Sequence, residues 1–141
     1  MSQENIEVVQ RENVEIARDA YAALNRGDID AALDAFHEDA EHDWSGSIGP
    51  DRAVYIGREQ ARKFWISAFE VVESVRFEIE ETVVEGPHVV LMMKAHIRGR
   101  GSGATAVGRS PHVWTLRDGK GTRFQLVQTW EEALEAVGLS E

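Results

Sequence analysis

The hydrophobic pattern of this chain changes period once, near Ser74, and that change restricts the folds that the chain can form. Before Ser74, apolar residues recur every three to four positions, which predicts helices over residues 6–25, 29–36 and 57–72. After Ser74, apolar and polar residues alternate, which is typical of strands with one buried face. Such a sheet must bury its apolar face against the helices, so the sequence predicts an α+β fold.

Turn-forming residues divide the second half of the chain into four predicted strands. Turns are expected at residues 85–88, at the glycine-rich segment 99–103 and at residues 118–120. Because short turns join consecutive strands, we expect an antiparallel meander, which a short helix over residues 131–137 follows. Residues 40–44, ahead of the third helix, are expected to form a further short strand.

Charge and cysteine usage exclude several classes of function. The net charge of -10 repels a phosphate backbone, so nucleic acid is not expected as a partner. The chain has no cysteine, which excludes disulfides, thiolate metal sites and cysteine nucleophiles. The five histidines show no short metal-ligand spacing, and no metal site is predicted.

The length and the N-terminal segment suggest how the chain is organised. A chain of 141 residues has the usual size of one domain and shows no linker, so we expect a single domain over residues 1–141. The first nine residues lack the basic and apolar regions of a signal peptide, and the longest aliphatic run, 89–93, is too short to span a bilayer. We therefore expect a cytoplasmic location and no membrane partner.

Five segments of the chain carry a family resemblance. They are YAALNRGDID at 21–30, FHEDA at 36–40, YIGRE at 55–59, HVWTLRDGK at 112–120 and EALEAVGL at 132–139. Together they resemble the nuclear-transport-factor-2-like superfamily, most closely its SnoaL-like and ketosteroid-isomerase-like branches. The resemblance implies a cone-shaped, curved antiparallel sheet wrapped around three N-terminal helices, with a mostly apolar pocket. Members include isomerases, cyclases, dehydratases, epoxide hydrolases and proteins without catalysis, so fold alone does not decide the function.

The three positions that the resemblance would assign to ketosteroid isomerisation are all changed. Ala20 stands in place of a tyrosine that donates to the oxyanion, with Tyr21 one residue later on the helix. Trp44 matches the general-base aspartate, and His112 matches the neutral carboxylic acid. Isomerisation by that mechanism is therefore not expected.

His112 is the main candidate for chemistry. Alternation places it on the same strand face as Trp114, which is the face expected to pack on the helices. With an ordinary pKa near 6.5, an imidazole on an apolar wall could remove or deliver a proton at cellular pH. The alternative is a core histidine satisfied by one hydrogen bond.

Segment 40–44 leaves its register open. The apolar residues suggest that His42 and Trp44 face inward, while a slip of one residue would bring Asp43 into the pocket as a base. Asp43 could equally be a solvated carboxylate at a strand end.

Four further residues are candidates for contact with a ligand. Glu81 and Gln128 continue apolar rows, although a β-bulge would turn Glu81 outward and Gln128 could satisfy a buried backbone group instead. Tyr21 and Trp65 would add a hydroxyl and an indole from the helices, or serve as core packing.

Two functions are compatible with these residues. The first is a cofactor-independent acid–base enzyme, acting on an apolar cyclic or isoprenoid-like molecule by isomerisation, cyclisation, dehydration or hydrolysis. In it His112 is the principal acid or base, assisted by His42 or Asp43, in a pocket lined by Trp44, Trp65, His112, Trp114 and Gln128. The second is a ligand-binding or dimerisation module without turnover.

The outer face of the sheet leads to a prediction about self-association. It carries Val113, Thr115 and Val127, and the family resemblance implies that such faces pair. We therefore expect a homodimer through this face.

Overall fold

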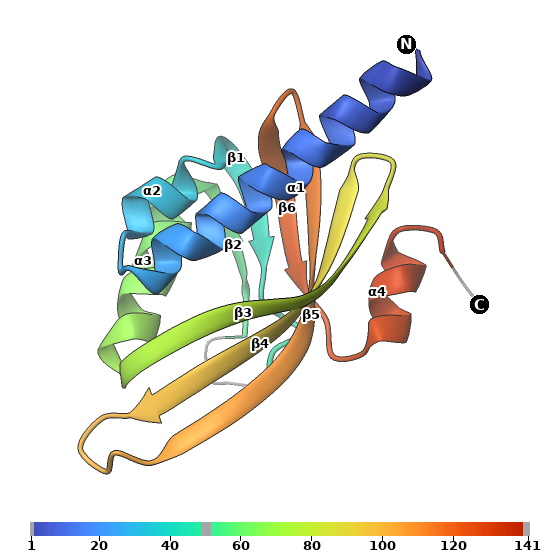
Figure 1. Ribbon diagram of the computed structural model, residues 1–141. Helices are drawn as coiled ribbons and strands as arrows, with labels where there is room; N and C mark the ends of the chain where they lie inside the picture. The colour runs from blue at the N-terminus through green and yellow to red at the C-terminus, as the bar shows by residue number, and fades with distance from the viewer. Residues whose placement is uncertain (1, 49–51, 140–141) are drawn as a thin grey trace.

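The computed structural model describes residues 2–48 and 52–139 (Figure 1). The elements follow one another as α1 (Gln3–Asn25), α2 (Ile29–Leu33), β1 (Phe36–Asp43), β2 (Val54–Ile56), α3 (Gly57–Glu70), β3 (Val72–Glu85), β4 (His88–Gly99), β5 (Thr105–Arg117), β6 (Lys120–Leu126) and α4 (Trp130–Ala136). Helices precede the long strands, as the change of period predicts. No helix in these two described ranges combines the length and apolar character needed to cross a bilayer.

The strands form one curved sheet with the order β2-β1-β6-β5-β4-β3. Strands β3 to β6 form the predicted antiparallel meander. Strand β1 adds to it in a different way, because it pairs in parallel with β6 and antiparallel with β2. The sheet bends across α1 and α3, and the α+β fold with a curved, unclosed sheet is confirmed.

Two predicted boundaries are wrong, and tertiary contacts explain both. The second helix ends at Leu33, and Phe36 starts β1, where its ring stacks on Trp114 with 4.4 Å between ring centroids. Phe36 fits there because it pairs with Gly121, at which a Cβ would lie 2.6 Å from the Phe36 ring. The last strand ends at Leu126 and does not continue to the helix predicted to start at residue 131, and the Thr129 side chain caps that helix.

The helices bury one stripe each against the inner face of the sheet. Ser2 caps the start of α1, and Gly27, in the left-handed conformation with φ 78°, follows its C-terminal end. The buried residues of α1 include Ala17, Tyr21 and Leu24, which recur at the spacing of one helix face. They pack on the largest fully buried side chains of the strands, which are Trp114, Leu91, Met93 and Val89.

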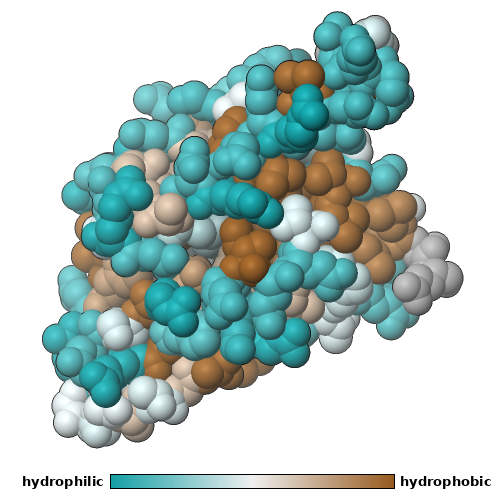
Figure 2. Space-filling model, in the orientation of Figure 1, coloured by the Kyte–Doolittle hydropathy of each residue, from teal (hydrophilic) through white to brown (hydrophobic). Residues whose placement is uncertain are grey.

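The outer face of the sheet has its own small core, which the sequence did not predict. Helix α4 folds back onto this face and covers Val90, Val113 and Val127 through Ala133 and Val137. Figure 2 shows hydrophobic side chains gathered in this region, where α4 lies beside the sheet. The homodimer was predicted because Val113 and Val127 were expected to be exposed on this face. That expectation is wrong, because both side chains are buried within the chain itself.

The free edge of β3 is held by a side chain of α1. The amide of Asn25 donates from Nδ2 to the Phe77 carbonyl at 2.9 Å, and its Oδ1 accepts the Phe77 N–H at 2.7 Å. One side chain thus satisfies two backbone groups that a neighbouring strand would otherwise pair with. This contact fixes Phe77, which forms part of the wall described next.

Candidate functional site

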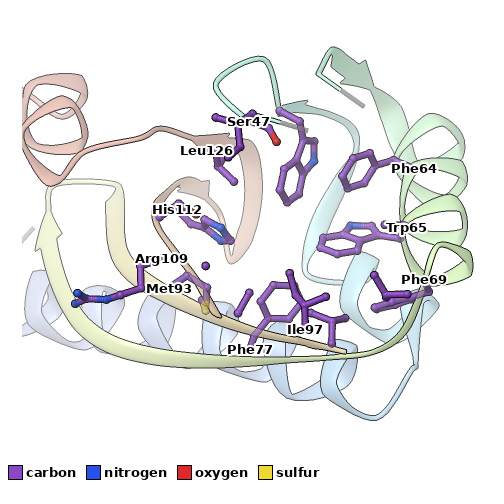
Figure 3. A pocket seen from close by; sticks show the side chains of 18 of the residues that line it. Ser47, Phe64, Trp65, Phe69, Phe77, Met93, Ile97, Arg109, His112 and Leu126 are labelled. Atoms are coloured by element: carbon purple, nitrogen blue, oxygen red, sulfur yellow. The ribbon is translucent and has the colours of Figure 1, made fainter. Parts of the chain in front are cut away.

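A cavity of about 400 Å³ lies between α3 and the inner face of the sheet. One wall is aromatic and consists of Trp44, Phe64, Trp65, Phe69 and Phe77 (Figure 3). The rest of the lining is mostly aliphatic and includes Met93, Ala95, Ile97 and Leu126, with Ala95 paired directly with Phe77 on the neighbouring strand. A cavity of this size and polarity suits an apolar small molecule with one or more rings.

His112 supplies the buried polar group of this cavity. Its side chain leaves β5 toward the helices, as alternation predicts, and its ring points into the cavity in Figure 3. The residue is 3% exposed, and burial lowers the pKa of His112 to about 3. The ring is therefore neutral at pH 7. The prediction that it exchanges a proton near neutral pH is wrong, because burial lowers its pKa too far.

Tyr21 and Trp114 form a hydrogen-bonded chain behind His112. The Trp114 indole donates from Nε1 to the Tyr21 hydroxyl at 2.9 Å, and the hydroxyl lies 2.6 Å from His112 Nδ1. Burial raises the pKa of the Tyr21 hydroxyl far above its usual range, so the phenol stays protonated. Tyr21 and Trp114 therefore support the histidine from behind instead of lining the main cavity.

The structure resolves the register that the sequence left open in β1. His42 and Trp44 face inward, and Trp44 forms part of the aromatic wall. His42 borders a separate void of about 20 Å³ behind that wall, which Tyr21, Trp114 and His112 also line. Desolvation by burial lowers the pKa of His42 to about 4. His42 is thus a second neutral imidazole, located behind the main cavity.

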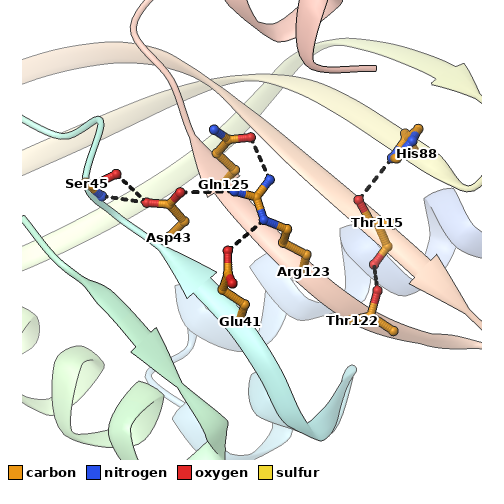
Figure 4. Close-up of polar contacts among 8 residues, drawn as sticks. All are labelled: Glu41, Asp43, Ser45, His88, Thr115, Thr122, Arg123 and Gln125. Atoms are coloured by element: carbon orange, nitrogen blue, oxygen red, sulfur yellow. Dashed lines mark hydrogen bonds and ion pairs between the residues drawn. The ribbon is translucent and has the colours of Figure 1, made fainter. Parts of the chain in front are cut away.

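Asp43 faces the other way, so it is not placed to act as a base in the cavity. Its carboxylate accepts from Arg123 Nη2 at 3.1 Å and from the Ser45 backbone N–H at 2.9 Å (Figure 4). Arg123 also donates to Glu41 at 2.7 Å, so the two outward carboxylates of β1 share one guanidinium. The hypothesis of an inward Asp43 is therefore corrected.

Glu81 lies outside the cavity as well. The pairing of β3 with β4 shifts between Ile79 and Glu81, which is the bulge kept as the alternative above, and the Glu81 side chain is exposed. The bulge ends the alternation that suggested an inward position.

Gln128 and Ile48 lie at the mouth of the cavity. Gln128 follows β6 and donates from Nε2 to the Gly46 carbonyl at 2.6 Å, which holds the loop after β1 against the end of the sheet. That loop approaches so closely that a Cβ on Gly46 would collide with the Leu126 carbonyl oxygen. Ile48 is 89% exposed although it contributes to the lining, so an apolar side chain marks the entrance.

The contribution of α3 was underestimated from the sequence. Trp65 was expected in the pocket, but Phe64 and Phe69, which also line it, were not among the predicted site residues. An aromatic residue in a core and one in a cavity wall have the same helical spacing, and only the curvature of the sheet separates them. Arg109 also contributes to the lining, but its guanidinium points away and donates to Glu80 at 2.7 Å.

The geometry defines what this site can do. It offers aromatic and aliphatic surfaces to a ligand and one neutral imidazole for a polar atom of that ligand. Within the described part of the chain, no group of three histidine, aspartate or glutamate side chains is arranged to hold a metal ion. Fold and site together define an α+β protein with a small-molecule cavity.

The chain belongs to the SnoaL-like domain family, whose sequence model matches residues 17–124. It is similar to the crystal structure of TerC co-crystallised with polyporic acid, with 25% identity and a TM-score of 0.73 over 89% of this chain and 97% of that one. A protein from Catenulispora acidiphila with a ketosteroid isomerase-like fold, in complex with trimethylamine, is 20% identical with a TM-score of 0.72, covering 89% of this chain and 93% of that chain. SalBIII, an epoxide hydrolase/cyclase-like enzyme of pyran ring formation in the polyether salinomycin, is 20% identical with a TM-score of 0.71, covering 85% and 92% respectively. The last two comparisons show the fold alone. No functionally curated protein matches the chain significantly.

Proposed function

We propose that this protein binds an apolar, ring-containing small molecule and converts it by acid–base chemistry without a cofactor. The cavity of about 400 Å³, which is mostly apolar and is lined by the buried His112 ring, is the observation that carries the proposal. TerC, a similar protein, was crystallised with polyporic acid, which supports a small molecule as the ligand.

His112 acts in this proposal by stabilising an oxygen of the substrate. A carbonyl oxygen beside the ring becomes more negative when the neighbouring C–H gives its proton to water or to a basic group of the substrate. An epoxide oxygen becomes more negative when its C–O bond breaks and leaves the electron pair on it. A hydrogen bond from a fixed neutral donor in a water-poor cavity strengthens as that charge develops, which lowers the barrier. Isomerisation, cyclisation, dehydration and epoxide opening all include a step in which negative charge develops on a substrate oxygen.

Binding without turnover is the second candidate, and a specific observation favours it. His112 and His42 both have a strongly lowered pKa, so neither readily takes up the proton that a general base must remove. A protein of this kind would hold or transport the ligand and leave it unchanged.

Cavity filling tests the binding step. Ala68 lines the cavity from α3, whereas Ala22 is exposed on α1, so Ala68→Phe and Ala22→Phe form a matched pair. In a screen of cyclic ketones, epoxides and polyketide-like compounds, ligands should stabilise the native protein and Ala22→Phe but not Ala68→Phe. Equal stabilisation of both variants would place binding elsewhere and contradict the proposal.

Substitution of His112 tests the catalytic step. His112→Leu removes the hydrogen-bond donor and keeps an apolar side chain, so it should abolish conversion of the ligand, followed by mass spectrometry. His112→Gln keeps a neutral donor and should retain part of the conversion. Ligand binding with no conversion by the native protein would favour the second candidate.

A homodimer through the outer sheet face is a separate proposal, and the structure changes the contact that it needs. Because α4 covers the valines, the open part of this face carries Val107, which is 56% exposed, beside ionic pairs such as Arg109–Glu80 at 2.7 Å. A dimer formed there should weaken with added salt. Light scattering should give the mass of two chains at low salt, and a mass near one chain at micromolar concentration would count against it.

A further inference from the structure

We propose that Trp114 and Tyr21 lock His112 in the tautomer whose Nε2–H faces the cavity, so that the site selects ligands with a neutral hydrogen-bond acceptor. The ligand class is a flat ring system bearing an uncharged carbonyl or epoxide oxygen. This inference rests on the proposed function and adds the chemical class of the ligand to it.

The direction of the hydrogen bonds follows from counting protons. The Trp114 indole can only donate, so the Tyr21 oxygen accepts from it at 2.9 Å. The Tyr21 proton then needs an acceptor, and His112 Nδ1 lies 2.6 Å away. If His112 donated from Nδ1 instead, the buried Tyr21 hydroxyl proton would have no acceptor among the residues that the structure describes, which costs free energy.

The two distances support the same direction. N–H···O bonds have donor–acceptor distances of about 2.9 to 3.0 Å, and bonds from a hydroxyl are shorter. The contact between Trp114 and Tyr21, at 2.9 Å, fits the first kind, and the contact between Tyr21 and His112, at 2.6 Å, fits the second. A neutral imidazole that accepts at Nδ1 carries its proton on Nε2.

The surroundings of His112 then decide which ligand charge is acceptable. The cationic group nearest the wall is the Arg109 guanidinium, which points away and pairs with Glu80. The other lining residues near the ring are Met93, Leu126, Trp44 and Ser110, which are uncharged and supply no counter-ion. A carboxylate placed there would lose its hydration without gaining a counter-ion, so an uncharged acceptor binds better.

The tautomer is measured on the free protein. Long-range ¹H–¹⁵N spectra of histidine-labelled protein at pH 7 should show His112 protonated at Nε2 and unprotonated at Nδ1. In Tyr21→Phe, which keeps the ring but removes the hydroxyl, both tautomers should appear. Tyr55→Phe removes the other tyrosine hydroxyl of the chain and should leave the His112 signals unchanged. A proton on Nδ1 in the native protein would overturn the tautomer assignment.

The ligand class is measured with three naphthalenes that differ in one substituent. 1-Acetonaphthone carries a neutral acceptor, 1-naphthoate an anion and 1-ethylnaphthalene no polar group. In His112→Leu, the affinity for the ketone relative to the hydrocarbon should fall about tenfold, the effect of losing one hydrogen bond. Tyr21→Phe should lower the same ratio about twofold, because only about half of the rings would then present Nε2–H, and Tyr55→Phe should leave it unchanged.

The outcomes separate this inference from the proposed function. If 1-naphthoate binds the native protein more tightly than 1-acetonaphthone, or the ratio is unchanged in His112→Leu, the ligand class is wrong although the cavity binds ligands. If none of the three probes binds, the proposed function fails and the ligand class fails with it, while the tautomer is decided by the spectra alone.

Discussion

Adjacent residues of β1 show that ionisable side chains have different surroundings on the two faces of the sheet. On the inner face, His42 is buried without a carboxylate beside it, and burial lowers its pKa to about 4. On the outer face, Asp43 and Glu41 share the guanidinium of Arg123. The chain therefore keeps its charges paired on the outer face and keeps the inner face neutral, which is the environment that an apolar ligand requires.

The largest effect should follow from truncating the inner face. Trp114→Ala removes a side chain that is 2% exposed, stacks on Phe36 and donates to Tyr21. We expect a loss of about 3–5 kcal/mol in the free energy of unfolding, measured by urea denaturation. Thr115→Ala, one residue later on the outer face, should cost about 1 kcal/mol. Equal losses would mean that the two faces do not differ as described.

Lowering the pH should destabilise the protein through the inner face. His42 and His112 have folded-state pKa values of about 4 and 3, below the ordinary value of 6.5 that they regain on unfolding. Between these values the unfolded chain binds more protons, so stability is complete above about pH 6.5 and falls as the pH decreases. From pH 7 to 5, each histidine should lower the free energy of unfolding by about 2 kcal/mol.

The variants His42→Gln and His112→Gln test whether these two histidines cause the loss of stability between pH 7 and pH 5. Each should reduce the difference between urea denaturation at pH 7 and at pH 5 by about half. If the native protein is equally stable at both pH values, the two imidazoles are not neutral and buried as the structure places them.

The sequence predicted the order of the helices and long strands and the inner faces of those strands, because alternation over many residues specifies a register. It did not predict the short strand β2. It could not decide the register of β1, since five residues allow two solutions and the contact of Arg123 with Asp43 is a long-range one. It also missed the position of α4, because an amphipathic helix shows that one face is buried but not against what.

The candidate site was likewise predicted only in part. His112, Trp44, Trp65 and Gln128 line the cavity or its mouth, as expected from their rows. Trp114 and Tyr21 lie one layer deeper, because periodicity gives the face of a residue and not its depth. Glu81 was predicted on the wrong face, because the bulge between Ile79 and Glu81 cannot be recognised from the alternation of the residues before it.

A smaller effect is expected on the outer face. Asp43→Ala removes one of two carboxylates from Arg123, and Gln125 also accepts from that guanidinium at 2.8 Å. Because Arg123 is 40% exposed, solvent screens the loss, and the cost in stability should be about 1 kcal/mol. Affinity for 1-acetonaphthone should remain unchanged in calorimetry, whereas a loss of binding would place Asp43 in the functional site after all.

The most direct test of the account is the titration of His112 by NMR, in the free protein and with 1-acetonaphthone bound. We expect its imidazole to stay neutral from pH 8 to pH 5, because burial lowers its pKa to about 3, and its Nε2 proton to shift when the ketone binds. The fully buried ring should show both properties in the same sample. An imidazole that titrates near pH 6.5, or whose signals do not respond to the bound ketone, would contradict the claim that His112 is the neutral hydrogen-bond donor of this cavity.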